Sequence, residues 1–394
     1  MDASLENWLE WAAAISWSST ATTTGATVLL LCAILTVMFQ LQSLKPKNAC
    51  GKNISVIANG KIQIYENLDW EPARREVFAE FQKLHLNLNH TLFFENDVGV
   101  KTKETYIVNS RGVELFTKIW LPETGKPKAI IFLCHGYGDT ITFYFEGIAR
   151  KFVIARYAVL GMDYEGFGLS SGLHCYIHNF DMLVDDVIEY YTSVREQPEF
   201  KGLPCFLLGE SMGGAVALKA HLKQPSIWDG AVLVAPMCKI AEDMYPPWLL
   251  VQILKILVPL FPTWKLVPNR DVAGHAFRDP EKRKQNAYNV IGYMGRPRLK
   301  TALELLRVTD EIEASLHKVS LPLLILHGAA DRVTDPSVSK ALYEQSNSSD
   351  KTLQLYEDAW HCILEGESDE CIHKVLDDIV FWLETHCTQS LGKS

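Results

Sequence analysis

Six short apolar runs, separated by stretches with helical spacing, constrain the fold of this chain most strongly. They lie between residues 129 and 357 and read AIIFLC, YAVLGMD, CFLLG, GAVLVA, LPLLILHG and TLQLYE. Runs of this length that are apolar on both faces are typical of parallel strands covered by helices. The sequence therefore predicts an α/β fold with a mostly parallel sheet flanked by helices. With 48% hydrophobic residues in a chain of 394, there is enough apolar side chain to build such a core.

The regular alternation stops after the fourth run and resumes only before the fifth. Proline clusters near residues 245–247 and 259–268 interrupt the stretch between them. We predict that this insertion is a helical cap over the carboxyl edge of the sheet. The chain then divides into an N-terminal tail (1–24), a candidate transmembrane anchor (25–44), a connector with one amphipathic helix (45–103), a first core segment (104–235), the cap (236–313) and a second core segment (314–394).

The segment 25–44 is uncharged over about the 20 residues that a bilayer span needs, and its strongly apolar part runs from Val28 to Phe39, a length that a signal-peptide core also has. Acidic residues precede it and Lys45, Lys47 and Lys52 follow it, so the positive-inside rule places the C-terminal side in the cytosol. The expected location is a membrane-anchored chain that faces the cytosol. A cleaved signal peptide and, from the Ser/Thr-rich run at 16–24, a plastid transit peptide are the alternatives. In the connector, the spacing predicts a helix over 69–88 with Asp69 as its N-cap.

The run CFLLG leads into GESMGG and then into a helical stretch, which gives a GxSxG motif between a strand and a helix. This context is that of a nucleophile elbow, a tight turn that lifts a serine out of the sheet. Glycines at 209 and 213 fit because a Cβ would clash in so sharp a turn. The hydroxyl of Ser211 would lie at the start of the helix, whose partial positive charge favours a developing oxyanion. We predict that Ser211 is a catalytic nucleophile.

A serine nucleophile needs a base, and the base needs an orienting acid. Asp331 follows the run LPLLILHG and His361 follows TLQLYE, so both lie in loops at the carboxyl ends of predicted strands. The order serine, acid, histidine is that of the α/β-hydrolase triad. Asp335 and Asp358 are the alternative acids.

An oxyanion hole needs two backbone N–H donors. One is the amide after the nucleophile, that of Met212. The run AIIFLC ends in HGYGD, where glycines at 136 and 138 would turn the backbone inward and make the Tyr137 N–H the second donor. His135 would brace this loop.

Charge and cysteine content exclude other classes of function. The formal net charge is −9 and the sequence has no Lys/Arg-rich run, which argues against a nucleic-acid partner. The nine cysteines have neither CxxC nor zinc-ligand spacing, so we predict no metal and no organic cofactor, and a reducing compartment.

These motifs, with MDYEGFGLSSG and PRLKTALELLRVTDEIEASL, resemble in order the monoacylglycerol lipase family of serine α/β-hydrolases, in its plant-type branch of lysophospholipase-like and caffeoylshikimate esterase-like members. The resemblance covers about residues 109–387 and implies the α/β-hydrolase fold and a triad of Ser211, Asp331 and His361. It implies hydrolysis of a lipid ester, with a monoacylglycerol as the expected substrate. Lysophospholipids and hydroxycinnamoyl esters are alternatives. Glu210 stands where animal members carry histidine.

A ligand-sensing receptor that keeps the hydrolase fold is the alternative of another class, and turnover against stoichiometric binding separates the two. Within the cap, the stretch WLLVQILKIL at 248–257 is apolar around more of its circumference than a helix lying on a core needs. We expect Trp248, Leu254 and Leu257 to contact an acyl chain, with a membrane-docking face or a simple buried helix as alternatives.

Overall fold

The computed structural model describes most of the chain after residue 53, and the predicted anchor 25–44 lies outside the described residues. The described residues are 54–58, 61–65, 67–83, 88, 90–93, 99–239, 248–267 and 272–391. Among the helices of these residues, none combines the length and the apolar character that crossing a membrane requires.

One sheet of eight strands forms the centre of the described part, with the order β10-β9-β8-β7-β5-β6-β4-β3. From β6 to β10 neighbouring strands are parallel, and β4 and β3 are added antiparallel at one edge. The predicted α/β class and all six predicted strands are confirmed. The bounds are β3 (Val100–Val108), β4 (Glu114–Pro122), β5 (Ile130–Cys134), β6 (Ala158–Met162), β7 (Cys205–Glu210), β8 (Gly230–Val234), β9 (Leu323–Gly328) and β10 (Lys351–Tyr356).

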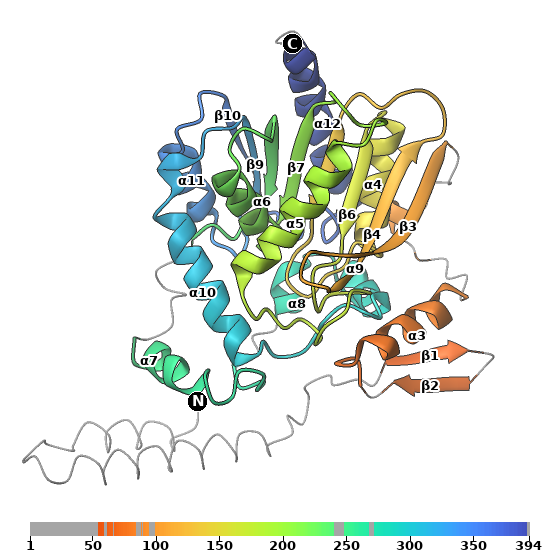
Figure 1. Ribbon diagram of the computed structural model, residues 1–394, viewed down its shortest axis with the longest axis vertical. Coiled ribbons are helices and arrows are strands. Elements are labelled where there is room, and N and C mark those ends of the chain that lie inside the picture. Colours follow the sequence, from red (N-terminus) through yellow and green to blue (C-terminus); the bar gives the residue numbers. More distant parts are fainter. Residues whose placement is uncertain are drawn as a thin grey trace, which may run out of the picture. The chain divides into compact units, whose positions relative to one another are not determined.

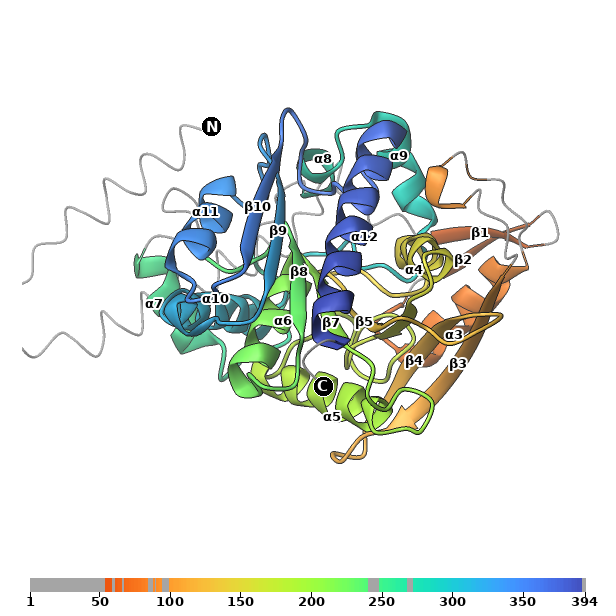
Figure 2. The ribbon, with the colours of Figure 1, turned by 90° about the horizontal axis from the view of Figure 1, so that it is seen from above.

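Helices cover both faces of this sheet (Figures 1 and 2). Because side chains alternate along a strand, β5 sends Ile131 and Leu133 into one core and Ile130 and Phe132 into the other. The first core is closed by α4 (Tyr144–Ile154) and α12 (Asp369–Leu391). The second is closed by α5 (Phe180–Arg195), α6 (Met212–Lys223), α10 (Leu299–Glu313) and α11 (Pro336–Gln345).

Between β8 and β9 the structure describes short helices in place of strands. They are α7 (Trp248–Leu257), α8 (Val272–Ala276), α9 (Pro280–Gln285) and the 3₁₀ turn η3 (Asn286–Tyr288), followed by α10 and the turn η4 (Leu316–Lys318). Helix α7 packs against α10. Leu254 and Leu257 lie on its buried side, whereas Trp248 is 73% exposed and Ile256 58% exposed. The predicted contact residues are thus divided between two sides of the helix.

Upstream of the sheet, the sequence reasoning missed a hairpin of β1 (Ile54–Ala58) and β2 (Lys61–Tyr65). The predicted helix is present as α3 (Glu71–Gln82), followed by the turn η1 (Thr91–Phe93). The prediction that Asp69 is the N-cap is wrong, because Trp70 occupies that position without a side-chain cap. The Asp69 carboxylate instead accepts hydrogen bonds from Arg298 at 2.6 Å and from Lys265 at 3.1 Å. Two cations compensate its charge better than the helix terminus could.

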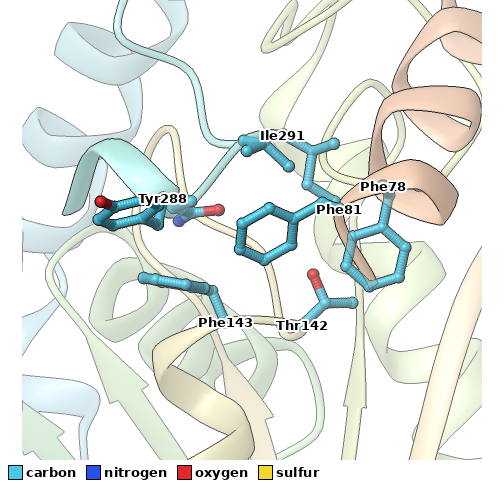
Figure 3. A pocket seen from close by; sticks show the side chains of 8 residues that line it. Phe78, Phe81, Thr142, Phe143, Tyr288 and Ile291 are labelled. Atoms are coloured by element: carbon cyan, nitrogen blue, oxygen red, sulfur yellow. The ribbon is translucent and has the colours of Figure 1, made fainter. Parts of the chain in front are cut away.

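Helix α3 is fixed to the core by a buried arginine. The Arg74 side chain is fully buried and donates to the carbonyl oxygens of Gly168 and Ser170, each at 2.7 Å, and of Leu68 at 3.0 Å. Its neighbours Phe78 and Phe81 face Phe143 and Tyr288 around a hollow of about 10 Å³ (Figure 3). That volume is the room of about one water molecule, so this hollow cannot hold an ester substrate.

Candidate active site

Ser211 lies in a strained turn between β7 and α6. Its backbone has φ +52° and ψ −118°, a conformation that L-residues rarely adopt. Gly213 must be glycine because a Cβ there would overlap the carbonyl oxygen of Cys134 on β5. The turn is closed by hydrogen bonds from the Ser211 N–H to Val234 O and from the Met237 N–H to Ser211 O, each 2.9 Å. The strain is therefore held by the neighbouring strand β8 and by the residues that follow it.

His361 and Asp331 come together from the loops after β10 and β9. The Nδ1 atom of His361 lies 2.7 Å from Oδ2 of Asp331, and both side chains are buried. Because β9 and β10 are parallel neighbours, their following loops meet at one edge of the sheet. A carboxylate at this atom fixes the Nδ1–H tautomer and leaves Nε2 free to accept a proton.

The Asp331 carboxylate is held by more than His361. Its Oδ1 accepts the backbone N–H of Val333 at 2.7 Å and of Thr334 at 3.1 Å, and its Oδ2 accepts the Thr334 hydroxyl at 2.9 Å. His327, at the end of β9, donates from Nε2 to the same Oδ2 at 3.0 Å. Burial alone would raise the pKa of Asp331, but the imidazoles of His361 and His327 outweigh it and hold that pKa well below its usual value. Asp331 is therefore ionised at every working pH.

The two alternative acids have other environments. The Asp335 carboxylate caps α11 by accepting the Ser337 N–H at 2.7 Å. Asp358 is exposed and occupies a turn with φ +59°. Of the three candidates, Asp331 is the one whose carboxylate contacts His361.

The loop after β5 passes beside Ser211. A Cβ on Gly136 would lie 3.6 Å from the Cβ of Ser211 and 3.7 Å from the carbonyl oxygen of Glu210, so the backbone of Gly136 lies next to the turn. Gly138 has φ +85°, and its carbonyl accepts the Tyr293 N–H at 2.7 Å. His135 stacks on Tyr164 with ring centroids 4.0 Å apart, and burial lowers its pKa to about 4. A neutral, buried His135 supports the loop, as predicted.

Three buried carboxyl groups interact electrostatically near this loop: those of Asp139, Glu210 and Glu365. Burial raises the pKa of Asp139 to about 7 and that of Glu365 to about 6, and raises the pKa of Glu210 well above its usual value. Glu210, Glu365 and the Cys362 thiol have oxygen and sulfur atoms within 4.8 Å of one another, the kind of grouping that can hold a cation. Burial also raises the pKa of Cys362 far above neutrality. Glu210 and Cys362 therefore retain their protons where a cation would need charged ligands.

Sequence reasoning missed His327, Thr334 and Glu365 as members of the site. His327 carried a usable signal, since a histidine inside an apolar strand run must find a buried partner. Thr334 and Glu365 carried none, because both lie in polar loop sequence.

The chain is similar in sequence to known proteins. The family described as serine aminopeptidase, S33 matches residues 125–369. Caffeoylshikimate esterase of Arabidopsis thaliana is 38% identical over 287 residues, covering 73% of this chain and 86% of the relative. Human monoglyceride lipase is 34% identical over 280 residues, which cover 71% of this chain and 89% of that protein.

Solved structures show the same fold. Monoacylglycerol lipase of Paleococcus ferrophilus superposes with a TM-score of 0.59 at 24% identity, covering 69% of this chain and 99% of that one. A soluble variant of monoglyceride lipase from Saccharomyces cerevisiae superposes with a TM-score of 0.63 at 19% identity, covering 75% of this chain and 98% of that one. The fold, the strained serine turn and these matches over most of the relatives' length lead to one assignment: the chain belongs to the serine aminopeptidase (S33) family of α/β-hydrolases, together with caffeoylshikimate esterase and the monoglyceride lipases.

Proposed function

We propose that this serine ester hydrolase cleaves monoacylglycerols through an acyl-enzyme intermediate. The observation that carries the proposal is Ser211 in its strained turn, at the edge of the sheet where the His361–Asp331 pair also lies. His361 takes the proton of Ser211, the serine oxygen attacks the ester carbonyl, and the Tyr137 and Met212 amides hold the oxyanion. Protonated His361 then donates to the departing alcohol, and water releases the fatty acid.

The 38% identity to caffeoylshikimate esterase favours one further candidate substrate, a hydroxycinnamoyl ester. Initial rates on a monoacylglycerol, a lysophosphatidylcholine and caffeoylshikimate, measured with one preparation, test the choice. The proposal expects the highest kcat/KM on the monoacylglycerol. A higher kcat/KM on either of the other two esters would make that ester the proposed substrate. Stoichiometric binding of the ester without turnover would instead favour a ligand-sensing receptor.

We take residues 236–313 as a cap, and the exposed side of α7 as its contact with a lipid surface. Trp248, Leu249 and Ile256 are each more than half exposed on this helix. Single exposed apolar residues are ordinary, but a group of them on one helix is typical of an interaction face. Leu254 and Leu257, on the other side, would help to hold the helix on α10.

Replacing Trp248 and Ile256 together by serine should weaken turnover of a long-chain monoacylglycerol in vesicles. Each buried side chain of this size is worth about 1.5–3 kcal/mol, so the pair should cost about 100-fold or more in vesicle affinity. Rates on a dissolved short-chain ester should stay within about twofold, since exposed substitutions change stability by less than about 0.5 kcal/mol. Phe381→Ser, on α12 and 74% exposed, is the matched control. Equal rates on vesicles for double variant and control would contradict the docking face.

We also propose that residues 25–44 anchor the chain in a membrane with the hydrolase facing the cytosol. The support is the uncharged stretch and the lysines that follow it. Removing residues 1–44 should convert a protein that sediments with membranes into one that stays in the supernatant, with its rate on short esters retained. Protease added outside intact microsomes should degrade the hydrolase part. Protection from that protease, or import into plastids, would overturn the topology.

A further inference from the structure

Two buried glutamates join the serine turn to the histidine loop. Glu210 is the last residue of β7, directly before Ser211, and Glu365 lies four residues after His361. The two residues are 4% and 5% exposed, and a carboxyl oxygen of each lies within 4.8 Å of the other. Oε1 of Glu210 and Oε2 of Glu365 have no hydrogen-bond partner within the described part of the protein. Burial and this proximity favour a state in which one of the two carboxyls keeps its proton and donates it to the other.

The surroundings of the pair disfavour a second negative charge. A protonated His361 imidazole is the group of opposite charge that lowers the pKa of Glu365. The other titratable groups that face the pair are neutral or acidic: Asp139 after β5, Tyr144 on α4, and Cys362 in the same loop as Glu365. The His90 Nε2 donates to the backbone oxygen of Glu365 at 2.8 Å, and burial lowers the pKa of His90 to about 4, so this ring is neutral. Two carboxylates in contact in such a place cannot both ionise without separating.

We propose that Glu210 and Glu365 are positioning residues whose shared proton holds the His361 loop against the Ser211 turn, and that alkaline loss of this proton releases the loop and stops catalysis. The proposal rests on the proposed function of Ser211 and His361. It assigns no contact with substrate to either glutamate. It concerns the distance between base and nucleophile, on which catalysis depends steeply.

Burial raises the pKa of both carboxyls, but at Glu365 the Cys362 contact and the His361 imidazole oppose it, whereas at Glu210 the charges of Glu365 and Asp139 add to it. Glu365 therefore ionises first and accepts the hydrogen bond of protonated Glu210. Burial and the charge of Glu365 raise the pKa of Glu210 well above its usual value. A carboxyl whose pKa is raised by folding stabilises the fold fully below its unfolded pKa of about 4.3, and this contribution is lost as pH rises through the folded value. Both stability and activity should therefore fall on the alkaline side.

The test is the pH dependence, from about pH 6 to pH 10, of kcat on a dissolved short-chain ester and of the rate of fluorophosphonate labelling. The natural protein should lose about tenfold in kcat per pH unit beyond the second ionisation of the pair, with KM little changed. Glu365→Gln keeps a hydrogen-bonding amide that does not ionise, so the fall of kcat at high pH, the alkaline limb of the profile, should disappear in this variant. Glu210→Gln should behave alike and should gain in melting temperature over the natural protein as pH rises.

Two control variants isolate the pair. Glu357→Gln, exposed at the start of the same loop, should keep the natural profile. Asp139→Asn should keep it too, and if it removed the limb the titrating group would be Asp139. An alkaline limb unchanged in both glutamine variants, or absent from the natural protein, would overturn the proposal. Absence of fluorophosphonate labelling at every pH would instead count against the function of Ser211, so the two failures are distinguishable.

Discussion

Ser211→Ala is expected to lower kcat for ester hydrolysis by about 10³-fold or more, with the fold intact. The reason is that the turn places one hydroxyl at the start of α6, where the backbone amides can stabilise the charge that develops on the attacked carbonyl. Alanine removes this oxygen and changes no backbone contact of the turn. Initial rates on a short-chain ester, with a melting curve of the same preparation, measure the effect.

Ser337→Ala on α11 is the matched control, because this serine is exposed and its substitution should leave the rate within about twofold. A Ser211→Ala protein that melts like the natural one and keeps its rate would remove Ser211 from the mechanism. His361→Ala should lose as much as Ser211→Ala, and the double variant should lose little more, since the two residues act as one unit.

Asp331→Asn should lower kcat by about 10⁴-fold while KM changes little. An asparagine amide facing Nδ1 of His361 can stabilise the wrong tautomer, so that the Nε2 atom that should receive the serine proton already carries one. It also removes the negative charge that stabilises the imidazolium formed during attack. Steady-state kinetics on a soluble ester separate kcat from KM.

Asp335→Asn makes the same chemical change four residues away and should be nearly silent, because asparagine caps a helix about as well as aspartate. If Asp335→Asn were the damaging substitution and Asp331→Asn were tolerated, the assignment of the acid would be wrong. His327→Gln should have an intermediate effect, since it withdraws one of the donors to Asp331 and leaves His361 in place.

The parts of the structure that the sequence predicted are those encoded by local patterns. The strands from β5 to β9 are fully buried and read as apolar runs, because both faces of a covered parallel sheet are buried, whereas the edge strand β10 is only partly buried. The Ser211 turn was predictable because GxSxG between a strand run and a helical stretch is a local pattern, although the space that Gly213 leaves is taken by the Cys134 carbonyl of distant β5. The order of Asp331 and His361 followed from the strands before them.

The parts that the sequence could not predict depend on contacts between distant segments. Asp69 looks like a helix cap until the fold brings Arg298, 229 residues later, to its carboxylate. Glu365 reads as an ordinary loop residue until β7 and the loop after β10 place it against Glu210. Leu254 and Trp248 have the same apolar character in sequence, and only the packing of α7 on α10 separates a buried side chain from an exposed one.

The proposed mechanism depends on Ser211 as the nucleophile of the ester hydrolase. Mass-spectrometric mapping of the adduct, after the full-length protein reacts with a fluorophosphonate, identifies the nucleophile. We expect a single adduct on Ser211, formed more slowly in the presence of a long-chain monoacylglycerol and absent from the Ser211→Ala protein. An adduct on another residue, or ester turnover that continues in a protein fully labelled at Ser211, would contradict it.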